Sequence, residues 1–242
     1  MRINYKSRTC RCSRSAYITG STLSPNFPTS DGAYQKTFKG AGGEVGWAAG
    51  DAFVARLSPA GDRLVFSTLV GGSRDERGAG IAVDERGNAW ITGNTLSRDF
   101  PVSTDARQRA YGGESIARSF HTGDAFLAQI DATGQALLYS TYLGGAGDDW
   151  GTGVAIDATG GVHVAGSTSS ADFPVTMGAY QTRYGTVPDI FLPFGDAFLA
   201  RFGEPPRLSI SAVVNAASYV GGAVAPGEIV TVTGVGIGPA AL

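Results

Sequence analysis

The sequence predicts an all-β protein built from a repeated unit. The segment AYITGSTLSPNFP at 16–28 returns as AWITGNTLSRDFP at 89–101 and as VHVAGSTSSADFP at 162–174, so the repeat advances by 73 residues each time. Within each unit the apolar runs are short and rich in Val, Ile, Phe, Tyr and Thr, which favours strands. No stretch shows the sustained apolar spacing of three and four residues that marks a helix, so we expect almost no helix.

The composition is typical of a folded protein with many tight turns. The chain of 242 residues is 43% hydrophobic and 17% charged, which is enough apolar sequence to build a core. Its 36 glycines are about twice the usual share, which indicates many turns. The net charge of −2 argues against a nucleic-acid partner. No apolar stretch reaches the length of a membrane span.

Each full unit reads as four strands, which in the second unit are GIAVD, AWITG, DAFLAQI and LLYSTYL. Quartets that end in glycine, such as SPAG at 58–61 and DERG at 84–87, separate the runs and favour short hairpins. Ile81 and Val83 point to one face of their strand and the small Ala82 to the other, so both faces need a neighbour. Four-stranded sheets that recur at a fixed period with neighbours on both faces indicate the blades of a β-propeller. A right-handed β-helix is the alternative.

The repeat also predicts how the chain is divided. We expect an atypical basic leader at 1–15, propeller units at 16–72, 73–145 and 146–203, a linker at 204–209 and a separate module at 210–242. The leader, which contains Cys10 and Cys12 as incidental thiols, lacks an apolar run, so we expect neither a signal peptide nor an innermost strand for the first unit.

The expected strand count is therefore ten, or about two and a half four-stranded blades. Propellers close with 4–8 blades. We expect the arc to be completed by further blades of a longer parent chain or by self-association.

The joint pattern of DAF-x-A, YSTYLGG, GIAVDERGN and T-x-S-x-DFP across residues 16–203 resembles the bacterial seven-bladed β-propeller repeat family. That resemblance implies a secreted or cell-surface location. The tail at 210–242, with VVNAASY, APGEIV and GVGIGP, resembles the opening of an immunoglobulin-like module found behind such propellers in soil bacteria. A complete sandwich needs roughly 100 residues, so we expect only a truncated β-sandwich start.

Some side chains recur in every unit, and we interpret them as structural. The phenylalanines are expected to pack against the blade edge, the prolines to fix the loop backbone and the aspartates to cap turns. Because the aspartates lie one per blade, we predict no metal site, and no cofactor is expected. The recurring residues are Phe27, Pro28, Phe100, Pro101, Phe173, Pro174, Asp51, Asp124 and Asp196.

The residues treated as specific to one unit are the candidate ligand-binding residues. Trp47, His121 and Trp150, with Asp148 and Asp149 beside Trp150, are expected on the face where the long loops gather. Aromatic rings next to carboxylates suit sugar rings, so a carbohydrate or protein ligand is the partner we predict. Alternatively, the tryptophans cover glycine-rich turns and His121 is an ordinary loop residue.

The sequence contains none of the catalytic motifs that we can test. Its two histidines do not form H-E-x-x-H, and neither G-x-S-x-G nor the phosphate-binding loop motif occurs. We therefore predict a non-catalytic secreted or cell-surface propeller that acts as a binding or structural scaffold, with glycans as the favoured ligand. One alternative is a polysaccharide hydrolase or lyase, which would need two carboxyl groups converging at roughly 5–10 Å. Another is a non-functional fragment of a longer propeller protein.

Overall fold

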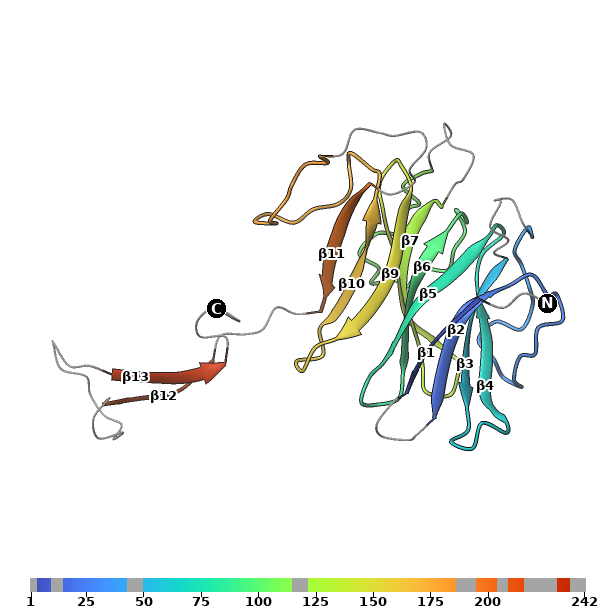
Figure 1. Cartoon of the computed structure of the whole chain (residues 1–242), viewed down its shortest axis with the longest axis horizontal. Coiled ribbons are helices and arrows are strands. Elements are labelled where there is room, and N and C mark those ends of the chain that lie inside the picture. Colours follow the sequence, from blue (N-terminus) through green and yellow to red (C-terminus); the bar gives the residue numbers. More distant parts are fainter. Residues whose placement is uncertain are drawn as a thin grey trace.

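The computed structural model describes residues 4–9, 15–42, 50–114, 122–185, 195–203, 209–215 and 230–235. Every regular element among these residues is a strand, and none is a helix (Figure 1). The strands form three antiparallel sheets that follow one another along the chain, plus a separate two-stranded sheet. The prediction of an all-β, partial propeller with an open arrangement of blades is confirmed.

Each of the three larger sheets is one blade, with its strands in chain order. The first blade contains β1 (Asn4–Thr9), β2 (Ala16–Thr22), β3 (Asp51–Leu57) and β4 (Leu64–Val70). The second contains β5 (Glu76–Val83), β6 (Ala89–Thr95), β7 (Asp124–Ile130) and β8 (Leu137–Leu143). The third contains β9 (Asp149–Ile156), β10 (Val162–Thr168) and β11 (Asp196–Phe202).

The expectation that residues 1–15 contribute no strand is wrong. β1 pairs antiparallel with β2 from Asn4 opposite Ser21 to Thr9 opposite Ala16, which completes the first blade with four strands. Its sequence, NYKSRT, has no apolar run, so the pattern of apolar residues did not predict a strand here. Backbone hydrogen bonds to β2 form the strand without that pattern. The three blades therefore contain eleven strands rather than ten.

The tail forms a hairpin of β12 (Ser209–Asn215) and β13 (Val230–Val235), which pair antiparallel with each other. β12 begins 72 residues after β8, at the repeat position of a fourth blade strand, but it pairs with β13 and not with β11. β11 is consequently the edge of a three-stranded sheet. The immunoglobulin-like interpretation of this tail stays a prediction.

The hairpin turns form as the glycine-ending quartets predict. In DERG the amide of Gly87 donates to the carbonyl of Asp84 at 3.0 Å, and in SPAG the amide of Gly61 donates to Ser58 at 2.9 Å. Gly87 has φ 86° and Gly61 has φ 74°, the left-handed region that glycine enters without a steric cost. The quartet DATG, which stands at 131–134 and again at 157–160, ends in the same way at Gly134 and Gly160.

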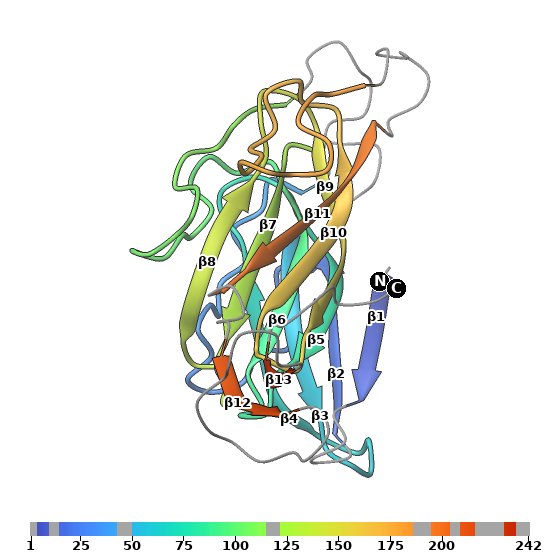
Figure 2. The same cartoon turned by 90° about the vertical axis from the view of Figure 1, so that its left-hand side faces the viewer.

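The blades stack face to face, and the core lies between them (Figure 2). Ile81 and Val83 pack in the cluster between the first and second blades, and Ala82 packs in the cluster between the second and third, as their alternation predicts. The Tyr17 hydroxyl also donates to the carbonyl of Gly87 at 3.1 Å across the first junction. Neighbouring blades are thus joined by a continuous apolar layer.

The recurring phenylalanine of each long loop packs against the phenylalanine of the third strand in its own blade. The ring centroids of Phe100 and Phe126 are 4.8 Å apart, and Phe27–Phe53 and Phe173–Phe198 repeat this contact at 4.7 Å. Phe100 is only 3% exposed and belongs to the core of the first junction, where it also contacts Tyr142. This loop residue is therefore part of the core between blades.

We predict that Phe100→Ala lowers the free energy of unfolding by about 3–5 kcal/mol, because it opens a cavity between two packed blades. The matched change Phe27→Ala is expected to cost clearly less, since Phe27 is partly exposed on the outer face of the first blade. Urea denaturation of both variants measures the difference. Equal losses would contradict the placement of Phe100 in the core of the junction.

Candidate functional site

The long loops and the turns between blades lie at the same end of the molecule (Figure 1). The loops connect β2 with β3, β6 with β7 and β10 with β11, and the turns connect β4 with β5 and β8 with β9. Side chains join the two kinds of connection: the amide of Gly144, in a turn between blades, donates to Gln108 Oε1 of a long loop at 3.0 Å. We call this end the loop face.

A glutamine and an aspartate hold each long loop to its blade. In the second blade Gln108 Nε2 donates to Asp124 Oδ2 at 3.1 Å, and the amides of Gly112 and Gly113 donate to the same carboxylate at 2.7 and 3.1 Å. The same pair recurs as Gln35 with Asp51 at 2.8 Å and Gln181 with Asp196 at 2.6 Å. We call this contact the Gln–Asp clamp, and it gives the recurring aspartates a structural role.

A second carboxylate lies beside each clamp at the two junctions between blades. Asp149, the first residue of β9, accepts hydrogen bonds at Oδ2 from the amide of Gly145 and the hydroxyl of Ser170, both at 2.8 Å. An ideal Cβ on Gly144 would lie 2.6 Å from Asp149 Oδ2 and 2.9 Å from Asp124 Oδ1, so carboxylates from neighbouring blades share the space that this glycine leaves. Asp51 and Glu76 approach Gly71 in the same way at the first junction.

Burial raises the pKa of these carboxyl groups. The pKa rises to about 8 for Glu76, to about 7 for Asp124 and to about 6 for Asp149, in each case chiefly because the group is removed from water. The neighbouring carboxylate adds to the rise, Asp51 for Glu76 and Asp149 for Asp124. Hydrogen bonds donated by backbone amides and hydroxyl groups partly oppose this rise in pKa. The same hydrogen bonds hold the paired acids within the junctions.

The structure does not place Asp148 and Asp149 at the surface. Asp148 is 5% exposed and Asp149 is fully buried. Asp148 Oδ1 accepts hydrogen bonds from the amides of Thr122 and Gly123 at 2.8 and 3.1 Å. Both acids also recur, since Asp75 and Glu76 stand 73 residues earlier, so they belong to the frame of the repeat. Trp47 and His121 lie outside the described residues.

Trp150 lies in β9 at the loop face and is partly exposed. The guanidinium carbon of Arg77, in β5 of the preceding blade, lies 5.0 Å from the centroid of the Trp150 ring. The two residues occupy the same repeat position in adjacent blades, and Arg77 is paired across the sheet with Asn94 of β6. Burial lowers the pKa of Arg77, which nevertheless stays a cation at neutral pH.

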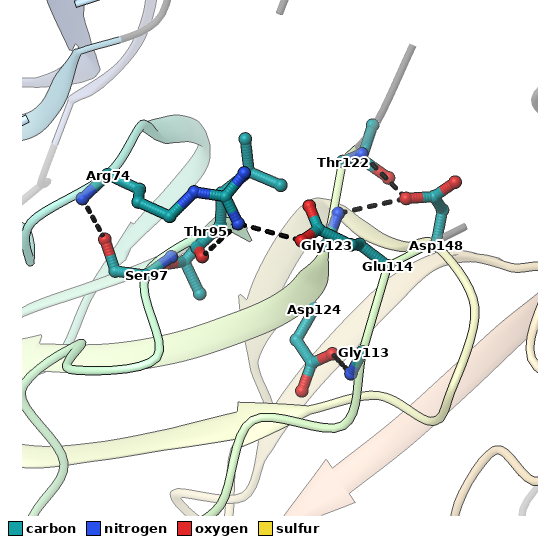
Figure 3. Close-up of polar contacts among 10 residues, drawn as sticks. Arg74, Thr95, Ser97, Gly113, Glu114, Thr122, Gly123, Asp124 and Asp148 are labelled. Carbon is teal, nitrogen blue, oxygen red and sulfur yellow. Dashed lines mark hydrogen bonds and ion pairs between the residues drawn. The ribbon is translucent and has the colours of Figure 1, made fainter. Parts of the chain in front are cut away.

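The loop face carries further polar contacts, among them those of Arg74, Glu114 and Asp148 (Figure 3). Arg74 Nη1 lies 2.9 Å from Glu114 Oε1 in a partly exposed ion pair, and the same nitrogen donates to the carbonyl of Leu96 at 3.1 Å. Asn94 Nδ2 donates to the carbonyl of Thr122 at 2.8 Å, next to the Asp148 contact. We group these side chains at the loop face, in or beside the innermost strands, under the name inner-strand cluster: Arg74, Arg77, Asn94, Glu114 and Trp150.

Sequence reasoning named Trp150 as a candidate but did not name the other members of the inner-strand cluster. A signal for them was present, because aligned units differ there: Arg74 stands opposite Gly147, and Asn94 stands opposite Ser21 and Ser167. The search for specific residues considered only tryptophan, histidine and adjacent acids. Comparing the units position by position would have marked the arginines as well.

The inner-strand cluster combines an aromatic ring, two guanidinium groups, an amide and a carboxylate. This set can stack on and hydrogen-bond to a polar ligand that offers a flat or apolar face. Within the described parts of the chain, no three His, Cys, Asp or Glu residues are grouped so that they could hold a metal ion. The same parts contain no helix of the length and apolarity that crossing a membrane requires.

Comparison with known families assigns the repeats. Residues 65–101 and 138–174 each match the family model SBBP, described as a beta-propeller repeat. These two segments are similar to beta-propeller repeats. Each begins in the fourth strand of one blade, crosses the junction and ends at the Phe-Pro pair of the next long loop. The search of curated proteins found no match to the chain.

We expect Gln108→Ala to loosen the loop of residues 96–123, because the change leaves buried Asp124 and the Gly144 amide without their amide partner. The cost in unfolding free energy should be about 1–3 kcal/mol. Limited proteolysis should show faster cleavage within 96–123. The control is Gln181→Ala, whose clamp in the third blade is exposed and whose loss should cost less. Unchanged cleavage in Gln108→Ala would refute the role of the clamp.

The junction carboxyl groups predict that stability falls as pH rises. Their pKa values of about 8, 7 and 6 lie above those in the unfolded chain, so the folded protein binds the protons more tightly. The stabilisation is complete below about pH 4 and is lost as the pH rises through the folded values. The Asp157 carboxyl, whose pKa is lowered by the Thr159 hydroxyl, loses its own contribution only in more acidic solution.

Urea midpoints measured from about pH 5 to about pH 9 test this prediction. Glu76→Gln imitates the protonated carboxyl, so its stability should depend less on pH than that of the parent chain. Glu85→Gln, at an exposed position in the β5–β6 turn, is the matched control and should keep the full dependence. A midpoint that climbs with pH over this range would contradict the assignment.

Proposed function

We propose that this chain is a non-catalytic propeller repeat protein that binds carbohydrate at the loop face, in an extracellular or cell-surface setting. The proposal rests on a contrast between side chains that recur in every blade and side chains that do not. The recurring Gln, Asp and Phe side chains hold loops and junctions together, whereas the inner-strand cluster departs from the repeat and all its members except Asn94 are partly exposed. The location rests on the family resemblance alone.

The chemistry of the cluster favours a sugar among polar ligands. Trp150 supplies an aromatic surface with the Arg77 guanidinium over it, and the Arg74–Glu114 ion pair supplies further charged groups at the loop face. Sugar rings present apolar C–H faces together with hydroxyl edges, so they fit an aromatic surface bordered by such groups. Because Arg77 already lies over one face of the ring, we expect a ligand to contact Trp150 and the guanidinium together.

The carboxylate pairs weigh against a glycoside hydrolase. Asp124 lies beside Asp149 and Asp51 beside Glu76, so carboxyl groups do converge. All four side chains are fully buried, however, and their oxygens accept hydrogen bonds from backbone amides of loops and turns. The arrangement also recurs at both junctions, as expected for a structural contact. A hydrolase needs one such pair in contact with solvent and substrate.

We expect oligosaccharides on a glycan array to bind the chain, with the best binder quenching or shifting the tryptophan fluorescence. Arg77→Gln and Trp150→Leu should each lower the affinity for that oligosaccharide by about five- to tenfold, because each removes one cation–π or stacking contact. Arg86→Gln is the matched control, since Arg86 is exposed in the β5–β6 turn at the opposite end of β5. Wild-type binding in both cluster variants would refute this site, and shortened oligosaccharides after incubation would refute a non-catalytic role.

A further inference from the structure

The third blade exposes a sheet face that the preceding blades keep buried. Leu199 of β11 is 73% exposed, and Ala155 of β9 and Ala165 of β10 are also exposed. In the second blade the same repeat positions hold Leu127, Ala82 and Thr92, which are 0%, 4% and 0% exposed because the third blade covers them. The face of β9, β10 and β11 is therefore a copy of a surface that is packed elsewhere in the molecule. We call it the trailing face.

The first blade carries the opposite kind of surface. Phe53, Ala55 and Leu69, which are 3%, 5% and 1% exposed, form a cluster on its outer side, and the partly buried Ile18, Phe27 and Phe38 pack against them. The corresponding residues of the second blade are the side chains that pack against the first blade, namely Phe126, Ala128, Tyr142, Ile91, Phe100 and Tyr111. We call the outer side of the first blade the leading face. Each internal junction joins one trailing face to one leading face.

The rim of the leading face has exposed leucine. Leu64 is 42% exposed and is paired across the sheet with Leu57. Its counterpart in the second blade, Leu137, is paired with Ile130 and packs on the cluster at the first junction. Leu64 therefore stands where a preceding blade would cover it, as Leu199 stands where a following blade would.

We propose that copies of this chain associate head to tail, with the trailing face of one copy packed on the leading face of the next. The contact continues the interface already present at both internal junctions, and it joins unlike faces, so it is heterologous. Two copies would bring together six blades, a number within the 4–8 blades of closed propellers. The occupant of the trailing face is thus a second copy of this chain.

Sedimentation velocity of the whole chain across the micromolar range tests the association. The parent chain should associate as its concentration rises. Leu199→Glu and Leu64→Glu should each weaken association at least about tenfold, because each places a charge where a leucine packs at the internal junctions. Leu138→Glu is the matched control, as Leu138 is 46% exposed on the outermost strand of the middle blade, and it should associate like the parent.

An equimolar mixture of the two face variants distinguishes head-to-tail contact from other modes. Each variant keeps one intact face, so the mixture should form a one-to-one dimer that grows no further, whereas either variant alone should associate at least about tenfold more weakly than the mixture. Circular dichroism establishes that each variant is folded. A parent chain that stays monomeric would overturn the second copy as the occupant. A mixture that fails to dimerise would overturn the head-to-tail geometry.

Discussion

The carboxylate at the start of each blade's third strand, which is buried in the first two blades, is the contact on which the described structure depends. Asp124 receives the Gln108 amide and two loop amides, and Gln108 in turn receives the Gly144 amide from the turn between blades. One polar centre thus fixes a long loop, a strand and the path into the next blade. Because the Asp124 carboxylate is buried away from water, it needs all of these hydrogen-bond donors. The long loop that supplies them is therefore held in a single geometry.

The second carboxylate extends this constraint from one blade to the next. The amide of Asp149 donates to the carbonyl of Gly123 at 2.6 Å, so the innermost strand of the third blade starts against the third strand of the second. Burial raises the pKa of both acids, and repulsion from the Asp149 carboxylate adds to the rise at Asp124. The same arrangement at Asp51 and Glu76 makes it a property of the repeat. Apolar packing then completes each junction, as Phe100 does against Phe126 and Tyr142.

Periodicity made most of the fold predictable. A strand buried on both faces repeats its small and large residues from unit to unit, and the alternation of Ile81, Ala82 and Val83 correctly placed Ala82 on the face opposite the other two. β1 was missed because NYKSRT lies outside the visible repeat and a strand at a sheet edge needs only backbone pairing. Asp148 and Asp149 were taken for surface residues because burial depends on the long loop that folds over them, and sequence spacing does not reveal that contact.

The repeat also explains where specificity can arise in such a molecule. At a clamp position a change of residue leaves a buried carboxylate or amide without its partner, so these positions are constrained to stay alike. At the loop face beside the innermost strands the constraint is weaker, and Arg77 and Trp150 show that one repeat position can carry quite different side chains in adjacent blades. Their contact crosses the junction, so the orientation of Trp150 depends on how the two blades pack. A recognition surface built in this way exists only when the blades are stacked.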